Sequence, residues 1–164
     1  MMREITGDHL GGSAAHVRII DTREKAQHQQ CFFAQLINLY QQLTERAPSR
    51  NIASLVSNDL HFIFIIQGTN LLASATLVLA RTAIRCQGLI EEVVVDQAYR
   101  KAGLGKILIE EALRLGRARG CQYMQLTSKP ERPGANMFYP KLGFELLAAA
   151  QDHPQGTNLY RCYL

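Results

Sequence analysis

The stretch that decides the fold is residues 93–106, which reads VVVDQAYRKAGLGK. Its three valines are typical of a buried strand, and they lead into a short loop with two glycines in which an amphipathic helix begins. Glycines let a ligand approach the backbone closely, and the first turn of a helix presents amides that have no acceptor inside the helix. These amides and the positive end of the helix dipole bind phosphate oxygens. The stretch therefore predicts a phosphate-binding turn between a strand and a helix.

Two common phosphate-binding loops do not fit this turn. The nucleotide P-loop needs Gly at the position of Arg100 and Ser or Thr at that of Ile107. The dinucleotide fingerprint needs a third Gly where Leu108 stands. Arg100, Lys101 and Lys106 nevertheless place positive charge at the turn. The alternative is a tight strand-to-helix connection whose charged side chains are simply solvated.

The turn and its neighbours resemble the GNAT superfamily of N-acetyltransferases. Residues 100–105, RKAGLG, match the Arg/Gln-x-x-Gly-x-Gly/Ala turn of that superfamily. Residues 89–96 resemble its fourth strand, and residues 136–144, NMFYPKLGF, resemble its late helix, written A-x-x-Phe-Tyr-x-x-x-Gly-Phe. The three pieces occur in the family's order and spacing across residues 89–144. The resemblance implies acetyl-CoA as co-substrate. The five histidines lack metal-ligand spacing, so no metal is expected.

The resemblance also implies which residues hold the coenzyme. In the family, the fourth strand and the strand after it splay apart, and the pantetheine arm lies between them. Backbone groups of Val93, Val94 and Val95 would pair with this arm as an added strand does, and an amide near Val94 would stabilise the oxyanion. The pyrophosphate would be held at the turn, which consists of Arg100, Lys101, Ala102, Gly103, Leu104, Gly105 and Lys106.

The late helix supplies the other implied site residues. Asn136 would form a hydrogen bond with the coenzyme, and Phe138 would pack beside it. Tyr139 would lie near the sulfur and donate a proton to the leaving thiolate. The alternatives are that Asn136 only caps its helix and that Tyr139 is a core aromatic residue beside Phe138 and Phe144.

Direct attack of an amine on a thioester needs a group that takes up the amine proton. Glu91 and Glu92 lie inside an apolar strand, where an unpaired carboxylate is costly. Strand alternation predicts that their side chains point to opposite faces, so that at most one reaches the acceptor cleft directly. Our hypothesis is that Glu92 accepts the proton or binds the amine. A salt-bridged structural carboxylate is the alternative.

The predicted function is an N-acetyltransferase that moves the acetyl group of acetyl-CoA onto a primary amine. Residues 90–95, IEEVVV, resemble the Ile-Glu-Asp/Asn-Val-Val-Val of glucosamine-phosphate acetyltransferases, which favours a small-molecule acceptor. A protein N-terminus or lysine is the alternative acceptor. The non-enzymatic alternative is an acyl-CoA-binding sensor or regulatory module.

The whole chain is expected to form one GNAT domain over residues 16–164, preceded by a loose segment at residues 1–15. The predicted α/β (α+β) fold is a single mixed, mostly antiparallel twisted sheet with a central parallel strand-helix-strand crossover and helices on both faces. Thr22 would cap the first helix, and Glu110 and Arg114 would pair on the outer face of a later one. The expected strands cover residues 16–21, 61–67, 71–81, 89–95, 122–127, 144–147 and 159–164, and the expected helices include residues 33–43, 104–118 and 135–142.

The composition of the chain limits the classes of partner that it can be expected to bind. The chain has 164 residues, a net charge of +4 and 47% hydrophobic residues, which is enough for one real core. The basic excess is too small and scattered to indicate nucleic acid, and the longest apolar stretch is too short to span a membrane. Four cysteines without close spacing are typical of reduced thiols in a cytoplasmic protein. The C-terminal strand, residues 158–164, is a candidate for edge pairing in a homodimer.

Overall fold

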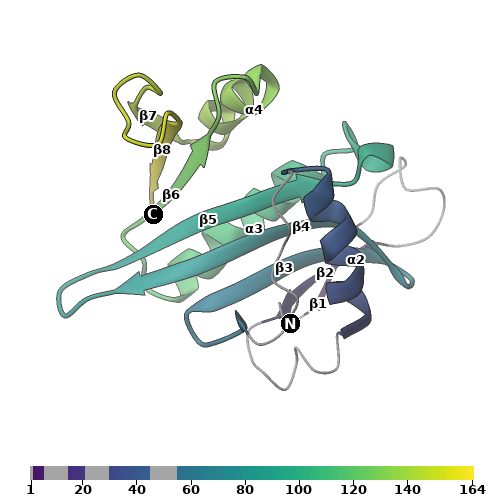
Figure 1. Cartoon of the computed structure of the whole chain (residues 1–164). Helices are drawn as coiled ribbons and strands as arrows, with labels where there is room; N and C mark the ends of the chain where they lie inside the picture. The colour runs from purple at the N-terminus through teal and green to yellow at the C-terminus, as the bar shows by residue number, and fades with distance from the viewer. Residues whose placement is uncertain (1, 6–14, 21–29, 45–54) are drawn as a thin grey trace.

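The computed structural model describes residues 2–5, 15–20, 30–44 and 55–164, and it contains one eight-stranded sheet in the order β1-β2-β3-β4-β5-β6-β8-β7 (Figure 1). The strands are β1 (Met2–Ile5), β2 (Ala15–Ile20), β3 (Leu60–Gln67), β4 (Asn70–Arg81), β5 (Cys86–Val95), β6 (Tyr123–Ser128), β7 (Glu145–Ala148) and β8 (Asn158–Tyr163). The helices are α2 (Gln30–Gln41), α3 (Leu104–Ala118) and α4 (Pro133–Phe138), with 3-10 turns η2 (Gln97–Tyr99) and η3 (Tyr139–Leu142). Strands β5 and β6 pair in parallel and the other neighbours are antiparallel, which confirms the predicted fold class.

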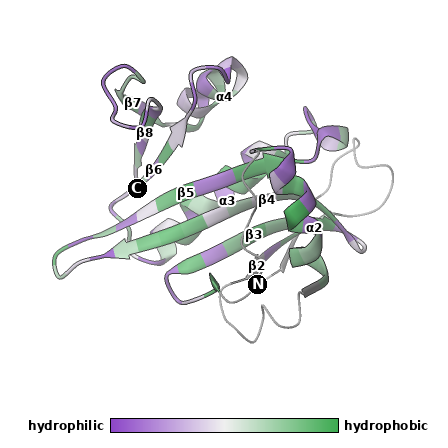
Figure 2. Ribbon diagram, in the orientation of Figure 1, coloured by the Kyte–Doolittle hydropathy of each residue, from purple (hydrophilic) through white to green (hydrophobic). Residues whose placement is uncertain are grey.

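Alternation along the central strands creates two hydrophobic cores. Phe62 and Phe64 of β3 belong to the core under α2, and Ile63 and Ile65 belong to the core under α3. The two helices therefore cover opposite faces of the sheet (Figure 1). Figure 2 shows the hydrophobic residues that run along the middle of β3 and β4. None of the helices in the described ranges has the length and apolar character needed to cross a bilayer.

The two ends of the chain differ from the sequence-based expectations. Residues 2–5, expected to be loose, form β1, which pairs with β2 and is the outer strand at that end of the sheet. Thr22, the expected helix cap, lies outside the described residues. Strand β8 is paired with β6 on one side and β7 on the other, so it is not the free edge proposed for pairing between two chains. The outer strand at this end of the sheet is β7.

Helix α3 approaches the sheet closely where β5 and β6 meet. Met124 of β6 is fully buried there, and its thioether lies between Gly88 of β5 and Gly116 of α3. A Cβ atom on Gly116 would lie 2.5 Å from the Sδ atom of Met124, and one on Gly88 would lie closer still. Both glycines are therefore needed for the close approach of helix, strand and methionine.

Strands β5 and β6 are paired along only a short part of their lengths. Their register joins residues 87–89 with residues 123–125. Beyond these residues β5 continues beside β4, and β6 continues beside β8. The two strands therefore diverge toward their C-terminal ends (Figure 1), which is the splay that the family resemblance implies.

Candidate active site

The loop between β5 and α3 is anchored to the end of helix α2. Asp96 caps η2, because its Oδ1 accepts a hydrogen bond of 2.8 Å from the amide of Ala98. The side-chain amide of Gln42 donates to Asp96 Oδ2 at 3.1 Å, and its Oε1 accepts from the amide of Gln97 at 3.0 Å. This network fixes where the chain enters the predicted phosphate turn.

The turn itself adopts the backbone that its glycine predicts. Lys101 and Gly103 have φ angles of +67° and +79°, in the left-handed region that residues other than glycine seldom occupy. The carbonyl of Gly103 accepts the first helical hydrogen bond, from the amide of Lys106 at 3.0 Å. The amides just ahead of Lys106 therefore have no acceptor within the helix and are available to an anion.

The side chains around the turn contribute charge and an aromatic wall. Nε of Arg100 donates to the carbonyl of Val95 at 3.3 Å, so its guanidinium is held beside the end of β5. Lys106 lies in an exposed ion pair with Glu110 at 3.7 Å. A Cβ on Gly105 would lie 3.9 Å from the ring of Phe138, so the structure brings Phe138 to the turn.

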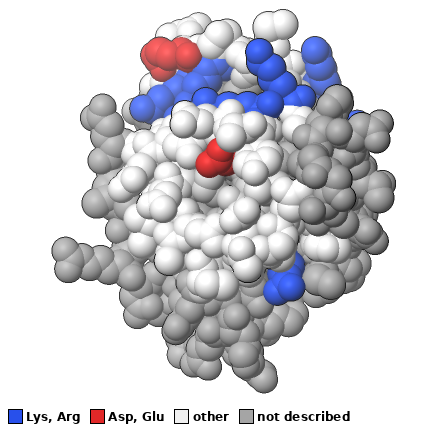
Figure 3. Space-filling view, turned by 90° about the vertical axis from the view of Figure 1, so that its right-hand side faces the viewer, with Lys and Arg blue, Asp and Glu red and all other residues white. Residues whose placement is uncertain are grey.

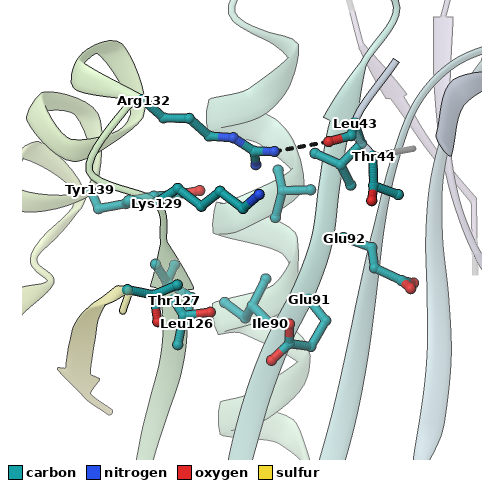
Figure 4. A pocket seen from close by; sticks show the side chains of 12 residues that line it. Leu43, Thr44, Ile90, Glu91, Glu92, Leu126, Thr127, Lys129, Arg132 and Tyr139 are labelled. Atoms are coloured by element: carbon teal, nitrogen blue, oxygen red, sulfur yellow. Dashed lines mark hydrogen bonds between the residues drawn. The ribbon is translucent and has the colours of Figure 1, made fainter. Parts of the chain in front are cut away.

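A pocket of about 300 Å³ opens where β5 and β6 diverge (Figure 4). It collects ionisable and hydroxyl groups from the end of α2, from both strands and from the segment around α4. Its lining residues are Leu43, Thr44, Ile90, Glu91, Glu92, Val93, Leu126, Thr127, Lys129, Arg132, Tyr139 and Thr157. The volume suits part of a small molecule rather than a macromolecule.

A β-bulge determines how the two glutamates enter this pocket. Thr76 of β4 pairs with Glu91 and Ser74 pairs with Val94, so β5 carries one residue more than β4 over this interval. Glu92 sits in the bulge with a φ of +52°. Bulges re-aim side chains and are common next to active sites. Because of the extra residue, Glu91 and Glu92 both line the pocket, which corrects the expectation that only one of them could reach it.

The carboxylate of Glu92 is held by two hydroxyl groups. Tyr40 of α2 donates a hydrogen bond of 2.7 Å to its Oε2, and Thr76 of β4 donates one of 2.8 Å to the same atom. The two hydroxyl oxygens lie 3.2 Å apart. Burial raises the pKa of the Tyr40 phenol, which therefore stays a neutral donor at ordinary pH.

The carboxylate of Glu91 points away from that of Glu92, toward β6. In Figure 4 it is directed toward the strand that carries Leu126 and Thr127, whereas the Glu92 side chain is directed away from that strand. Removal from water is the main cause that raises the pKa of Glu91, and repulsion from the charge of Glu92 raises it further. The carboxylate of Glu91 therefore holds a proton more readily than an ordinary glutamate does.

Tyr139 is both a core residue and a pocket residue. It is only 8% exposed, and its ring packs against the rings of Phe138, Phe144 and Tyr160. It also lines the pocket together with Glu91. Burial raises the pKa of the Tyr139 phenol; Arg132 lowers it, and Tyr160 and Glu91 raise it further. The phenol is therefore protonated at neutral pH and can donate a proton.

Asn136 is engaged with protein atoms. Its Nδ2 donates to the carbonyls of Lys129 at 3.0 Å and Pro130 at 3.4 Å, and its Oδ1 accepts from the hydroxyl of Tyr160 at 3.3 Å. These bonds hold the segment that leads into α4. They agree with the alternative in which Asn136 has a local structural role, and its contact with the coenzyme stays a prediction.

Two basic residues of the pocket escaped the sequence analysis. Lys129 and Arg132 precede α4 and reach across the pocket from that side (Figure 4). Arg132 donates to the carbonyl of Leu43 at 2.9 Å, so it bridges the pocket to the end of α2. On the face seen in Figure 3, Lys and Arg side chains gather along the top, at the height of α4 in Figure 1. The sequence signal that could have identified Lys129 and Arg132 is their position just before the late-helix motif.

Known proteins resemble this chain in sequence and in structure. It is 47% identical over 60 residues, 37% of its length, to a glucosamine 6-phosphate N-acetyltransferase of Trypanosoma brucei brucei. It is 35% identical over 103 residues, 60% of its length, to glucosamine 6-phosphate N-acetyltransferase 1 of Oryza sativa subsp. japonica. The matches cover only 39% and 61% of these relatives' own lengths.

A crystal structure of a Trypanosoma brucei acetyltransferase superposes with a TM-score of 0.64 and 28% identity, covering 82% of this chain and 94% of that one. Residues 23–144 match the acetyltransferase (GNAT) family, so the chain belongs to this family. The resemblance read from the turn and the late helix is thereby confirmed.

Proposed function

We propose that this protein transfers the acetyl group of acetyl-CoA to the primary amine of a small molecule. The observation that carries the proposal is that β5 lines the pocket at residues 90–93 and then runs, along the side that β6 leaves unpaired, directly toward the α3 turn. A diphosphate on the turn amides directs an extended thioester arm along β5 toward the pocket. Family membership supports acetyl-CoA as the co-substrate.

The residues of the chain suit this ligand. The turn offers first-turn amides, left-handed backbone at Lys101 and Gly103, and exposed positive charge. Along β5, the backbone of residues 93–95 borders the region that β6 leaves unpaired. In the proposed reaction these residues bind the pantetheine arm, and the amide near Val94 donates to the developing oxyanion. Tyr139 protonates the departing sulfur, and Glu92 binds the amine.

The pocket also supports a charged acceptor. Glu91 and Glu92 offer negative charge for an ammonium group, and Lys129 and Arg132 offer positive charge on the opposite side. An amine that also carries a phosphate or carboxylate would satisfy both pairs. The names of the two curated relatives favour an amino sugar phosphate as the first compound to test.

Coenzyme binding is tested by thermal unfolding with and without coenzyme A, since a ligand that binds only the native state raises Tm. We expect Gly103→Glu to abolish the rise, because it places bulk and negative charge at the turn. Gly120→Glu is the matched control: Gly120 has a similar φ of +75° and equally open surroundings at the other end of α3. An equal loss of binding in both variants, or none in Gly103→Glu, would contradict the phosphate assignment.

Catalysis is tested by thiol release from acetyl-CoA with a panel of amines. The panel contains glucosamine 6-phosphate, glucosamine, a polyamine and a peptide with a free N-terminus. We expect release with the phosphorylated amino sugar to exceed that with glucosamine. Preference for the peptide would support a protein acceptor, and binding of coenzyme without release for any amine would support the sensor function instead.

A further inference from the structure

We propose that Glu91 is the group that accepts the amine proton, and that Tyr40 and Thr76 position Glu92 as the fixed anion that holds the amine. This inference rests on the proposed acetyl transfer and divides its proton chemistry between two adjacent carboxylates. It replaces the hypothesis from sequence that Glu92 serves as the base.

The hydrogen bonds distinguish the two carboxylates. Both bonds to Glu92 end on Oε2, from donors on α2 and β4. Two hydroxyl donors on one oxygen hold this carboxylate in a defined orientation. Its Oε1 receives neither bond and remains for an ammonium or amine hydrogen. Glu92 is therefore suited to holding the amine in a fixed position.

Glu91 has the opposite environment. Its carboxylate points into the gap beside β6, and within the described part of the chain it is bound by no hydrogen bond or ion pair. The ionisable groups that line the same pocket are Glu92 on its own strand, Tyr139 from η3, and Lys129 and Arg132 from the segment before α4. Burial and the negative charge of Glu92 raise the pKa of Glu91, which makes it a stronger base than an ordinary glutamate.

The bulge is the physical cause of this division. Without the extra residue, Glu91 and Glu92 would lie on opposite faces of β5, and one would be buried among the residues under α3. The left-handed φ of Glu92 is a strained backbone conformation for a glutamate. In this conformation its carboxylate accepts the hydrogen bonds from the hydroxyls of Tyr40 and Thr76. Both carboxylates are thereby kept at one pocket with different hydrogen-bond partners.

The proton balance of the reaction follows. The amine nitrogen, held by Glu92, forms the new C–N bond with the acetyl carbon and gives its proton to the carboxylate of Glu91. As the C–S bond breaks, its electron pair leaves with sulfur, which takes the proton of the Tyr139 phenol. The proton on Glu91 then returns through solvent to the Tyr139 phenolate. The net change is amine plus thioester to amide plus thiol.

The first test titrates the carboxyl groups by NMR in protein labelled with ¹³C at the glutamate side-chain carboxyl, with Glu91→Gln assigning the signal. We expect Glu91 to titrate above the ordinary Glu value of about 4.3, and we expect Glu92→Gln to move the Glu91 titration downward because a like charge is removed. Titration of Glu91 at the ordinary value, unmoved by Glu92→Gln, would overturn the inference. This readout needs no substrate.

The second test compares pH profiles of kcat/KM for thiol release with glucosamine 6-phosphate. We expect Glu91→Gln to lower kcat roughly 10²–10⁴-fold and to remove the acidic limb. We expect Glu92→Gln, and more weakly Tyr40→Phe and Thr76→Val, to raise KM for the amine while the acidic limb persists. An acidic limb lost in Glu92→Gln and kept in Glu91→Gln would reverse the assignment.

The thermal shift caused by coenzyme A, measured for each variant, distinguishes a failure of the proposed acetyl transfer from a failure of the roles assigned to Glu91 and Glu92. A wild-type protein that coenzyme A does not stabilise contradicts the acetyltransferase function itself. A full shift in every variant, with the wrong carboxylate controlling the profile, contradicts only the division between Glu91 and Glu92.

Discussion

The guanidinium of Arg114 lies 2.6 Å from the carboxylate of Glu111, one turn earlier in α3. Nε of Arg114 also lies within hydrogen-bond distance of both oxygens of that carboxylate. The side chain of Glu111 is only 4% exposed, so this pair neutralises a buried charge. The expected partner of Arg114, Glu110, is instead paired with Lys106 at the surface.

We predict that Arg114→Ala lowers the free energy of unfolding by about 1–3 kcal/mol, because it leaves the buried carboxylate of Glu111 without its charged donor. Urea denaturation monitored by circular dichroism measures the change. Lys106→Ala, which breaks the exposed pair with Glu110, is the control and should cost about 0.5 kcal/mol or less. Equal losses in the two variants would show that the buried Glu111–Arg114 pair contributes no more to stability than the exposed Lys106–Glu110 pair.

Gly116→Ala should destabilise the protein although alanine is the better helix former. The new Cβ would lie 2.5 Å from Met124 Sδ and 3.1 Å from Leu164 Cδ1, and Met124 cannot move away freely because Gly88 lies on its other side. We expect a loss of about 1–3 kcal/mol in urea denaturation. Gly134→Ala in α4, whose Cβ would meet nothing within 4 Å, should be neutral or slightly stabilising.

Iodoacetamide should label the cysteines in a fixed order. Cys31 is exposed, whereas Cys86 and Cys121 are buried with their sulfur atoms 3.2 Å apart. Burial, and then Cys86, raise the pKa of Cys121 to about 12, and burial raises that of Cys162, so little thiolate forms at pH 8. Mass spectrometry of native protein should find the label on Cys31, and Cys31→Ser should remain unlabelled until urea is added. Rapid labelling of Cys121 in the folded protein would contradict this order.

Stability should fall steeply above pH 10. Burial raises the pKa of Tyr40 and of Tyr139 above the ordinary 10.0, so both phenols keep their protons in the folded state where the unfolded chain releases them. The unfolded state then binds fewer protons, and the free energy of unfolding decreases as the pH rises. Urea midpoints at pH 8, 10 and 11 measure the slope. The double variant Tyr40→Phe, Tyr139→Phe should show a shallower slope, and an unchanged one would contradict the assignment.

Much of the fold was predictable because short-range patterns determine it. The alternation of β3 places Phe62 and Ile63 in different cores, and Gly68, with a φ of +56°, turns the chain into β4. The glycine at position 103 marks the start of α3 for the same reason. The spacing of Leu108, Glu111 and Leu115 places Glu111 on the buried face of α3.

The geometry of the glutamates was not predictable from their own strand. The run IEEVVV has no feature that shows where an extra residue will be accommodated, because the bulge depends on pairing with Thr76. The partner Tyr40 lies 52 residues away in the sequence from Glu92 and meets it only through the packing of α2. Lys129 and Arg132 were missed because loops have no periodicity, and their role depends on the arrangement of strands on either side.

The short pairing between β5 and β6 divides the sheet into two parts that are joined by a narrow seam. Residues 87–89 and 123–125 form the seam, and Met124 fills the space behind it. An extended ligand arm between the strands would add rungs to the ladder beyond the residues that β5 and β6 pair directly. Amide hydrogens in the C-terminal half of β5 should then report each binding event through slower exchange with solvent.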